Sequence, residues 1–244
     1  MASDLDLAFA LADAADELTL ARFRAPDLRV ETKPDLSPVS EADHAVEEAI
    51  RAVLARERPD DVVVGEEYGH DEGDGRRWIV DPIDATKNYV RGIPLFATLI
   101  ALEDEVAVVS APALRKRWWA TRGGGAFADG ERMAVSKIAR LEDAVLTYTS
   151  LRDFDEPFFA LARRVWAPRG FGDFWQYMLL AEGCVDVSVE SAANLWDLAA
   201  PKLIIEEAGG RLTDMAGNDT AAGGNAVASN GLLHEATLDA LRLE

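Results

Sequence analysis

Apolar residues recur at helical spacing over the first 23 residues of the chain. The leucines and alanines that would share one helical face are Leu7, Leu11, Ala14, Leu18 and Ala21. Aspartates interrupt the run and no basic residue precedes it, which argues against a signal peptide. The pattern therefore predicts an amphipathic surface helix.

A second helix is predicted after a turn-rich segment that extends to about residue 40. Three prolines punctuate this segment, and Ser40 and Asp43 are candidate caps for the helix that follows. The apolar stripe of this helix would consist of Ala45, Ile50, Val53 and Leu54.

Two short apolar runs then end at acidic residues. Residues 62–64 are all valine and the run stops at Gly65, which places Glu66 at a strand end. Residues 78–80 repeat this plan, with Asp81 at the end of the strand and Pro82 beginning a turn.

The rest of the chain reads as further strands and helices. Asp129-Gly130 is a hairpin signal between two extended runs, and Pro201 fits a helix over 194–210 only in its first turn. Asp197 lies near the start of that helix. The other predicted elements are strands at 95–102, 105–110, 145–151, 185–191, 211–215 and 226–230, and helices at 156–166, 173–183 and 234–243.

This order is not a strict βαβ repeat, so mixed sheets are predicted. We expect an α+β fold in which residues 1–244 form a single domain. Two tightly packed halves would compose it, with helices and an antiparallel sheet over about residues 1–140 and an α/β half over about residues 141–244.

Charge narrows the possible functions. The formal net charge of −19 disfavours nucleic acid as a partner, and it also requires bound cations if the substrate is a phosphate. No apolar run is long enough for a membrane span, and Cys184, the one cysteine, rules out an internal disulfide and reads as a packed thiol. We expect a soluble, cytoplasmic protein.

Four carboxylates stand at predicted element ends: Glu66, Asp81, Asp84 and Asp197. Magnesium prefers such hard oxygen ligands, and the segment 81–84 would aim two of them, with the carbonyl of Ile83, at one point. The alternative is that they are solvated surface acids. Thr86 follows at the possible start of a short helix, where backbone amides bind anions well; it could also be an ordinary helix cap, and the two roles are compatible.

Three motifs in order resemble the inositol monophosphatase family of magnesium-dependent phosphatases. They are GEE at 65–67, WIVDPIDATKNY at 78–89 and WDLAAPKLIIEEAGG at 196–210. The resemblance runs from the first helix to the last and implies a layered αβαβα fold, a homodimer, and two or three Mg²⁺ ions in each active site.

The resemblance also implies roles for individual residues. Glu66, Asp81 and the carbonyl of Ile83 match the ligands of one magnesium ion, while Asp81, Asp84 and Asp197 match those of a second. The pair Glu66 and Thr86 matches residues that orient a metal-activated water, with Asp43 behind Thr86. Backbone amides of Ala85 and Thr86 match a phosphate cradle.

Ala85 departs from the family pattern, which has glycine there. With a negative φ, alanine would keep its amide at little cost. With a positive φ, it would cost about 1 kcal/mol, and its methyl group would crowd the phosphate.

Within the family the chain resembles histidinol-phosphate phosphatases of the actinobacterial type, which act late in histidine biosynthesis. The segments 33–43, 84–94, 110–120 and 171–186 carry this likeness. Asp173, Glu190 and Asp197 match positions that contact the organic part of the substrate, and carboxylates there suit the cationic histidinol phosphate. The alternative for Asp173 is a helix cap.

Two other functions stay open. One is the hydrolysis of inositol 1-phosphate or of another sugar or nucleotide-derived monophosphate by the same site. The other is a non-catalytic or moonlighting role in protein binding, which the complete set of predicted site carboxylates disfavours.

Overall fold

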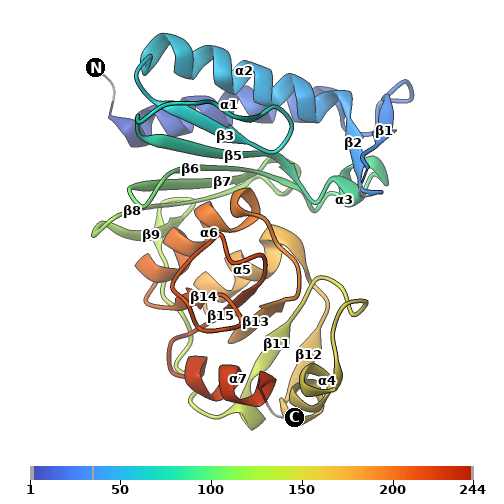
Figure 1. Ribbon diagram of the computed structural model, residues 1–244, viewed down its shortest axis with the longest axis vertical. Coiled ribbons are helices and arrows are strands. Elements are labelled where there is room, and N and C mark those ends of the chain that lie inside the picture. Colours follow the sequence, from blue (N-terminus) through green and yellow to red (C-terminus); the bar gives the residue numbers. More distant parts are fainter. Residues whose placement is uncertain (1–2, 35, 243–244) are drawn as a thin grey trace.

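A computed structural model describes residues 3–34 and 36–242 and shows helices and sheets in five alternating layers (Figure 1). The helices are α1 (Asp4–Arg22), α2 (Glu41–Glu57), α3 (Thr86–Val90), α4 (Glu156–Arg164), α5 (Asp173–Ala181), α6 (Leu195–Glu207) and α7 (His234–Leu241). The layers are α1 with α2, a first sheet, α5 with α6, a second sheet, and α4 with α7 (Figure 1). The predicted α+β fold with mixed sheets in an αβαβα order is confirmed.

The first sheet has eight strands in the order β10-β9-β8-β7-β6-β5-β3-β4. Its pairs are antiparallel except for β3 with β5, which are parallel. The strands are β3 (Val62–Gly65), β4 (Gly69–His70), β5 (Arg77–Asp84), β6 (Ala97–Leu102), β7 (Val106–Ala111), β8 (Lys116–Thr121), β9 (Gly125–Ala128) and β10 (Glu131–Arg132). The predicted hairpin at Asp129-Gly130 joins the last two.

Both faces of this sheet are covered, which explains why its central strands are almost entirely apolar. Every residue of β6 and β7 is buried, with α1 and α2 on one side and α6 on the other (Figure 1). Strand β5, whose carboxyl end carries Asp81 and Asp84, is thereby held between two apolar cores.

The second sheet has five strands in the order β12-β11-β13-β15-β14. β11 is parallel to both β12 and β13, and the remaining pairs are antiparallel. The strands are β11 (Val145–Thr147), β12 (Ala167–Arg169), β13 (Val187–Glu190), β14 (Arg211–Thr213) and β15 (Ala226–Ser229). A separate two-stranded ribbon, β1 (Val30–Thr32) with β2 (Pro38–Ser40), precedes α2.

Both predicted caps of α2 are present. The Ser40 side chain accepts a hydrogen bond from the helix start, and the Asp43 carboxylate accepts one from the Ser40 amide at 2.8 Å. The predicted helical faces are correct only in part, because Ala21 and Ala45 are exposed, while the chain buries Ala8 and Val46 instead. Of the predicted last helix, 234–243, residue 243 lies outside the described residues.

Three local predictions are wrong. No turn begins at Pro82, since β5 continues through Asp84. Pro201 lies in the second turn of α6, where its missing N–H leaves the Asp197 carbonyl without its usual helical partner. Cys184 is exposed rather than packed, because the chain turns outward at Gly183, where φ is 73°.

Among the described residues, no helix combines the length and the apolar character needed to cross a bilayer. The division of a single domain at about residue 140 stays a prediction. It is supported by the two sheets, since the last strand of the first ends at Arg132 and the first strand of the second begins at Val145.

Candidate active site

Three carboxylates converge at the carboxyl end of β5. Asp81 and Asp84 belong to that strand, and Asp197 lies in the first turn of α6. One oxygen of each lies within 4.8 Å of the others. The structure therefore brings together three of the four acids that the sequence places at element ends.

A β-bulge explains how two aspartates three residues apart reach the same side. In a regular strand, residues i and i+3 point to opposite faces. Here Asp81 pairs with Leu99 and Asp84 with Ala97, so β5 holds one residue more than β6 over this stretch. Pro82 lies in the bulge, and its carbonyl accepts a hydrogen bond from Thr98 Oγ1 at 2.8 Å.

The three carboxyl groups repel one another in a buried setting. Burial raises the pKa of Asp81 and of Asp84 well above the usual range, and neighbouring carboxylates raise both further. Burial also raises the pKa of Asp197 to about 6. Such a cluster is favourable as three anions only when positive charge balances it.

The free oxygen atoms fit a hard divalent cation. Asp81 Oδ1 is buried and has no hydrogen-bond partner. Asp84 Oδ2 accepts the Phe174 amide at 2.7 Å, and Asp197 Oδ2 accepts the Asn194 amide at 2.7 Å. Backbone amides thus orient two of the carboxylates and leave an oxygen of each for the centre. Carboxylate oxygens in this arrangement suit magnesium.

Glu66 lines the same cavity but lies outside the close triad. Its Oε1 pairs with Lys33 Nζ at 2.8 Å, and the same ammonium pairs with Glu67 Oε1 at 2.7 Å. Lys33 comes directly after β1, so the ribbon is anchored at the edge of the site.

Thr86 and Asp43 meet behind the triad, as the family resemblance implies. Thr86 Oγ1 lies 3.0 Å from the Ile83 carbonyl oxygen and 3.3 Å from Asp43 Oδ1. Asp43 is fully buried, and burial raises the pKa of its carboxyl. Thr86 is not the cap of α3, because that position belongs to Ala85.

Ala85 adopts the left-handed conformation, with φ 66° and ψ 43°. Of the two conformations considered for this departure from the family pattern, the strained one is therefore present. Asp173 also has a positive φ, of 48°.

Asp173 lines the cavity, whereas Glu190 lies behind it. Asp173 is the first residue of α5, with Gly172 at the cap position, so it is not a helix cap. Glu190 accepts hydrogen bonds from Gln176 Nε2 at 3.0 Å and from the Thr149 hydroxyl. Burial raises the pKa of Glu190 to about 7.

The cavity that these residues share has a volume of about 190 Å³. Its remaining lining includes Ser37, Pro38, Lys87 and Asn194. This volume is small, and the ribbon residues Ser37 and Pro38 form part of its wall.

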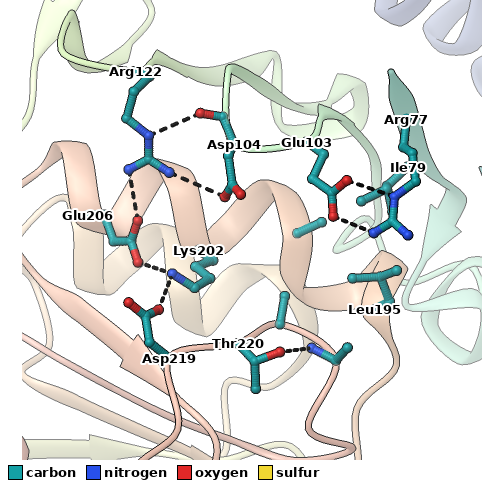
Figure 2. A pocket seen from close by; sticks show the side chains of 13 residues that line it. Arg77, Ile79, Glu103, Asp104, Arg122, Leu195, Lys202, Glu206, Asp219 and Thr220 are labelled. Carbon is teal, nitrogen blue, oxygen red and sulfur yellow. Dashed lines mark hydrogen bonds and ion pairs between the residues drawn. The ribbon is translucent and has the colours of Figure 1, made fainter. Parts of the chain in front are cut away.

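A larger cavity of about 510 Å³ lies along a different face of α6 (Figure 2). Its cations are each paired with carboxylates of the same cavity, as Figure 2 shows: Arg77 with Glu103, Arg122 with Asp104 and Glu206, and Lys202 with Glu206 and Asp219. Because these three cations are all paired with carboxylates, most of the charge of this lining is compensated. Five carboxylates line the acidic cavity, which is therefore the better candidate for chemistry.

Comparison with known proteins agrees with this geometry. The model of the inositol monophosphatase family matches residues 1–243. The chain belongs to this family. A histidinol-phosphatase of Mycobacterium tuberculosis is 53% identical to it, over 98% of this chain and 97% of that protein, and one of Streptomyces coelicolor is 51% identical over 96% and 95%. A solved IMPase of Thermotoga maritima is 33% identical, with a TM-score of 0.88 over 97% of this chain and 96% of that one.

Sequence reasoning missed two cations of the site, Lys33 and Lys87. Both stand in segments that carry the family likeness, 33–43 and 84–94. Only the folded chain shows that one of them binds Glu66 and that the other lines the cavity.

Proposed function

We propose that this family member is a magnesium-dependent phosphomonoesterase that hydrolyses L-histidinol phosphate to L-histidinol and phosphate in histidine biosynthesis. The observation that carries the proposal is the 53% identity to a histidinol-phosphatase over almost the whole chain. The buried triad of carboxylates supports the dependence on a cation.

Magnesium would be held by Asp81, Asp84 and Asp197, with Glu66 and the Ile83 carbonyl as further ligands. When bound, it supplies positive charge against the phosphate and lowers the pKa of water, so that a hydroxide nucleophile can form near neutral pH. Glu66 Oε1 lies 2.8 Å from Lys33 Nζ, so a magnesium ion would share this carboxylate with the lysine or take it over. The number of ions, two or three, stays a prediction.

The chain's own groups would orient the attacking water. Thr86 can donate its single hydroxyl proton to the buried Asp43, which leaves the hydroxyl oxygen free to accept a hydrogen bond from water. Glu66, which lines the same cavity, would accept the second proton of that water. The amides of Ala85 and Thr86 would bind the phosphate.

Carboxylates would bind the organic part of the substrate and select for its positive charge. Asp173 lines the cavity and faces the same space as Asp197, so a cationic group there would meet two negative charges. Glu190 would support this end from behind through Thr149, which also accepts the Asp173 amide at 2.9 Å.

The decisive experiment is phosphate release from L-histidinol phosphate and from inositol 1-phosphate, each with magnesium and with EDTA. We expect a magnesium-dependent preference for histidinol phosphate. Asp173→Ser should reduce kcat/KM for this ester about 10-fold or more and leave that for the inositol ester nearly unchanged. Asp153→Ser, an exposed aspartate outside the cavity, is the matched control.

A preference for inositol 1-phosphate would instead support the second candidate, a monophosphatase like the Thermotoga IMPase that shares the fold. Release from neither ester would favour a binding role for the chain. A third result is an equal kcat/KM for both esters that Asp173→Ser does not change. It would refute the substrate assignment and leave the phosphatase function standing.

We further propose that the chain forms a homodimer. Three large apolar side chains near the edge strand β12 are well exposed: Leu151 (47%), Trp166 (72%) and Phe171 (41%). Their burial against a second copy would remove apolar surface from water. A mass of 26.5 kDa by light scattering, that of one chain, would exclude the dimer.

A further inference from the structure

Lys87 is the one basic residue in the lining of the catalytic cavity, as far as residues 3–34 and 36–242 show. It is the second residue of α3 and directly follows Ala85 and Thr86. Its side chain is exposed, and no carboxylate in the described part of the chain lies within ion-pair distance of its ammonium group. Lys33, by contrast, is held by Glu66 and Glu67.

The charge around Lys87 is strongly negative. Five carboxylates line the same cavity: Glu66, Asp81, Asp84, Asp173 and Asp197. A phosphate ester that enters this space meets repulsion unless cations compensate it. Lys87 is the compensating charge that the chain itself supplies.

Lys87 also lies close to Asp173. Burial raises the pKa of Asp173, and the charge of Lys87 acts in the opposite direction. Two functions are therefore compatible with its place, either binding of the phosphate or modulation of Asp173. The absence of an ion pair between the two side chains in the described residues favours the first.

We propose that Lys87 is a substrate-binding residue that contacts a phosphate oxygen and sets the affinity for phosphate esters irrespective of their alcohol part. A lysine ammonium is a compact charge on a flexible stem, which suits phosphate in changing orientations. The inference rests on the proposed phosphatase function and adds to it a phosphate-binding cation that the chain itself supplies.

The test compares Lys87→Met and Lys87→Arg with Arg91→Met. Arg91 is an exposed cation at the end of the same helix and does not line the cavity, so its removal changes the net charge equally. KM and kcat are measured for L-histidinol phosphate and for glycerol 2-phosphate, whose alcohol part is neutral. The Kd of inorganic phosphate is measured by calorimetry with magnesium present.

We expect Lys87→Met to raise both KM values and the Kd of phosphate by a similar factor of about 10, with a smaller factor at high salt. Lys87→Arg should retain most of the affinity, and Arg91→Met should behave as the wild type. Both Met variants should melt at the same temperature as the wild type, which would show that their fold is intact.

Three results would overturn the inference. The first is an unchanged Kd of phosphate in Lys87→Met. The second is a rise in KM confined to histidinol phosphate, which would show that Lys87 acts through Asp173. The third is an equal rise in KM and Kd in Arg91→Met. If the wild type hydrolyses neither ester, the proposed function fails. The Kd values of phosphate still show whether Lys87 binds phosphate.

Discussion

Ala85 is the residue whose backbone conformation has the clearest energetic consequence. At φ 66° the backbone is strained because Cβ comes too close to the following carbonyl oxygen, whereas glycine adopts this conformation freely. We expect Ala85→Gly to raise the free energy of unfolding by about 1 kcal/mol, measured by urea denaturation. The amide of residue 85 would stay in place for the phosphate.

A matched control is Ala52→Gly, on the exposed side of α2. There the backbone is right-handed, and the same substitution should lower the free energy of unfolding by about 1 kcal/mol. Destabilisation by both substitutions would show that residue 85 is not strained.

Single residues also show how far a sequence can be interpreted. The aspartates of the triad stand in specific motifs at strand and helix ends, and they could be predicted. The pairing of Lys33 with Glu66 could not, because it joins residues 33 positions apart through the fold of the ribbon. The exposure of Cys184 likewise depends on the direction in which the chain leaves α5.

At the scale of elements, the strands and long helices follow from apolar periodicity, whereas their irregularities do not. The bulge of β5 depends on its register with β6, which local sequence does not encode. The helical pattern of α6 places Pro201 inside the helix, and packing against the first sheet stabilises it there. The bulge matters most, since it turns Asp84 toward Asp81.

His234 joins α7 to the second sheet and predicts a pH dependence of stability. It is fully buried, with Thr213 Oγ1 2.9 Å from Nε2 and Ser229 Oγ 3.0 Å from Nδ1. Burial lowers its pKa from 6.5 to about 4. The unfolded chain therefore binds a proton that the folded chain does not, and stability falls as the pH drops from about 6.5 to about 4.

Between pH 7 and pH 5 this loss amounts to about 2 kcal/mol. Urea denaturation of the wild type and of His234→Gln at both pH values would isolate it, because the variant lacks the titrating group. The advantage of the wild type should shrink as the pH falls. An advantage that is constant or larger at pH 5 would contradict the buried neutral imidazole.

At the scale of the whole molecule, five layers place the acidic cavity where the first sheet meets the helices of the middle layer (Figure 1). Those layers stabilise a fold that holds three mutually repelling carboxyl groups in its interior. The repulsion should lower the free energy of unfolding of the protein without magnesium, and magnesium should raise it again by binding only the folded state.

Asp84→Asn tests that account. The asparagine oxygen can still accept the Phe174 amide, while one buried charge disappears. In EDTA at pH 8 the variant should melt at a higher temperature than the wild type. Added magnesium should raise the melting temperature of the wild type but barely change that of the variant, which should also lose most phosphatase activity.

The pH provides an independent control for the same site. Because the pKa of Asp197 is raised to about 6 in the folded protein, its stabilising protonation is lost as the pH rises through that value. The stabilisation by magnesium should therefore grow between pH 5 and pH 8 in the wild type and in Asp153→Asn, whose exposed aspartate lies outside the cavity. An equal magnesium shift in Asp84→Asn would place the cation elsewhere, because a cation held by Asp81, Asp84 and Asp197 would lose one of its three charged ligands in this variant.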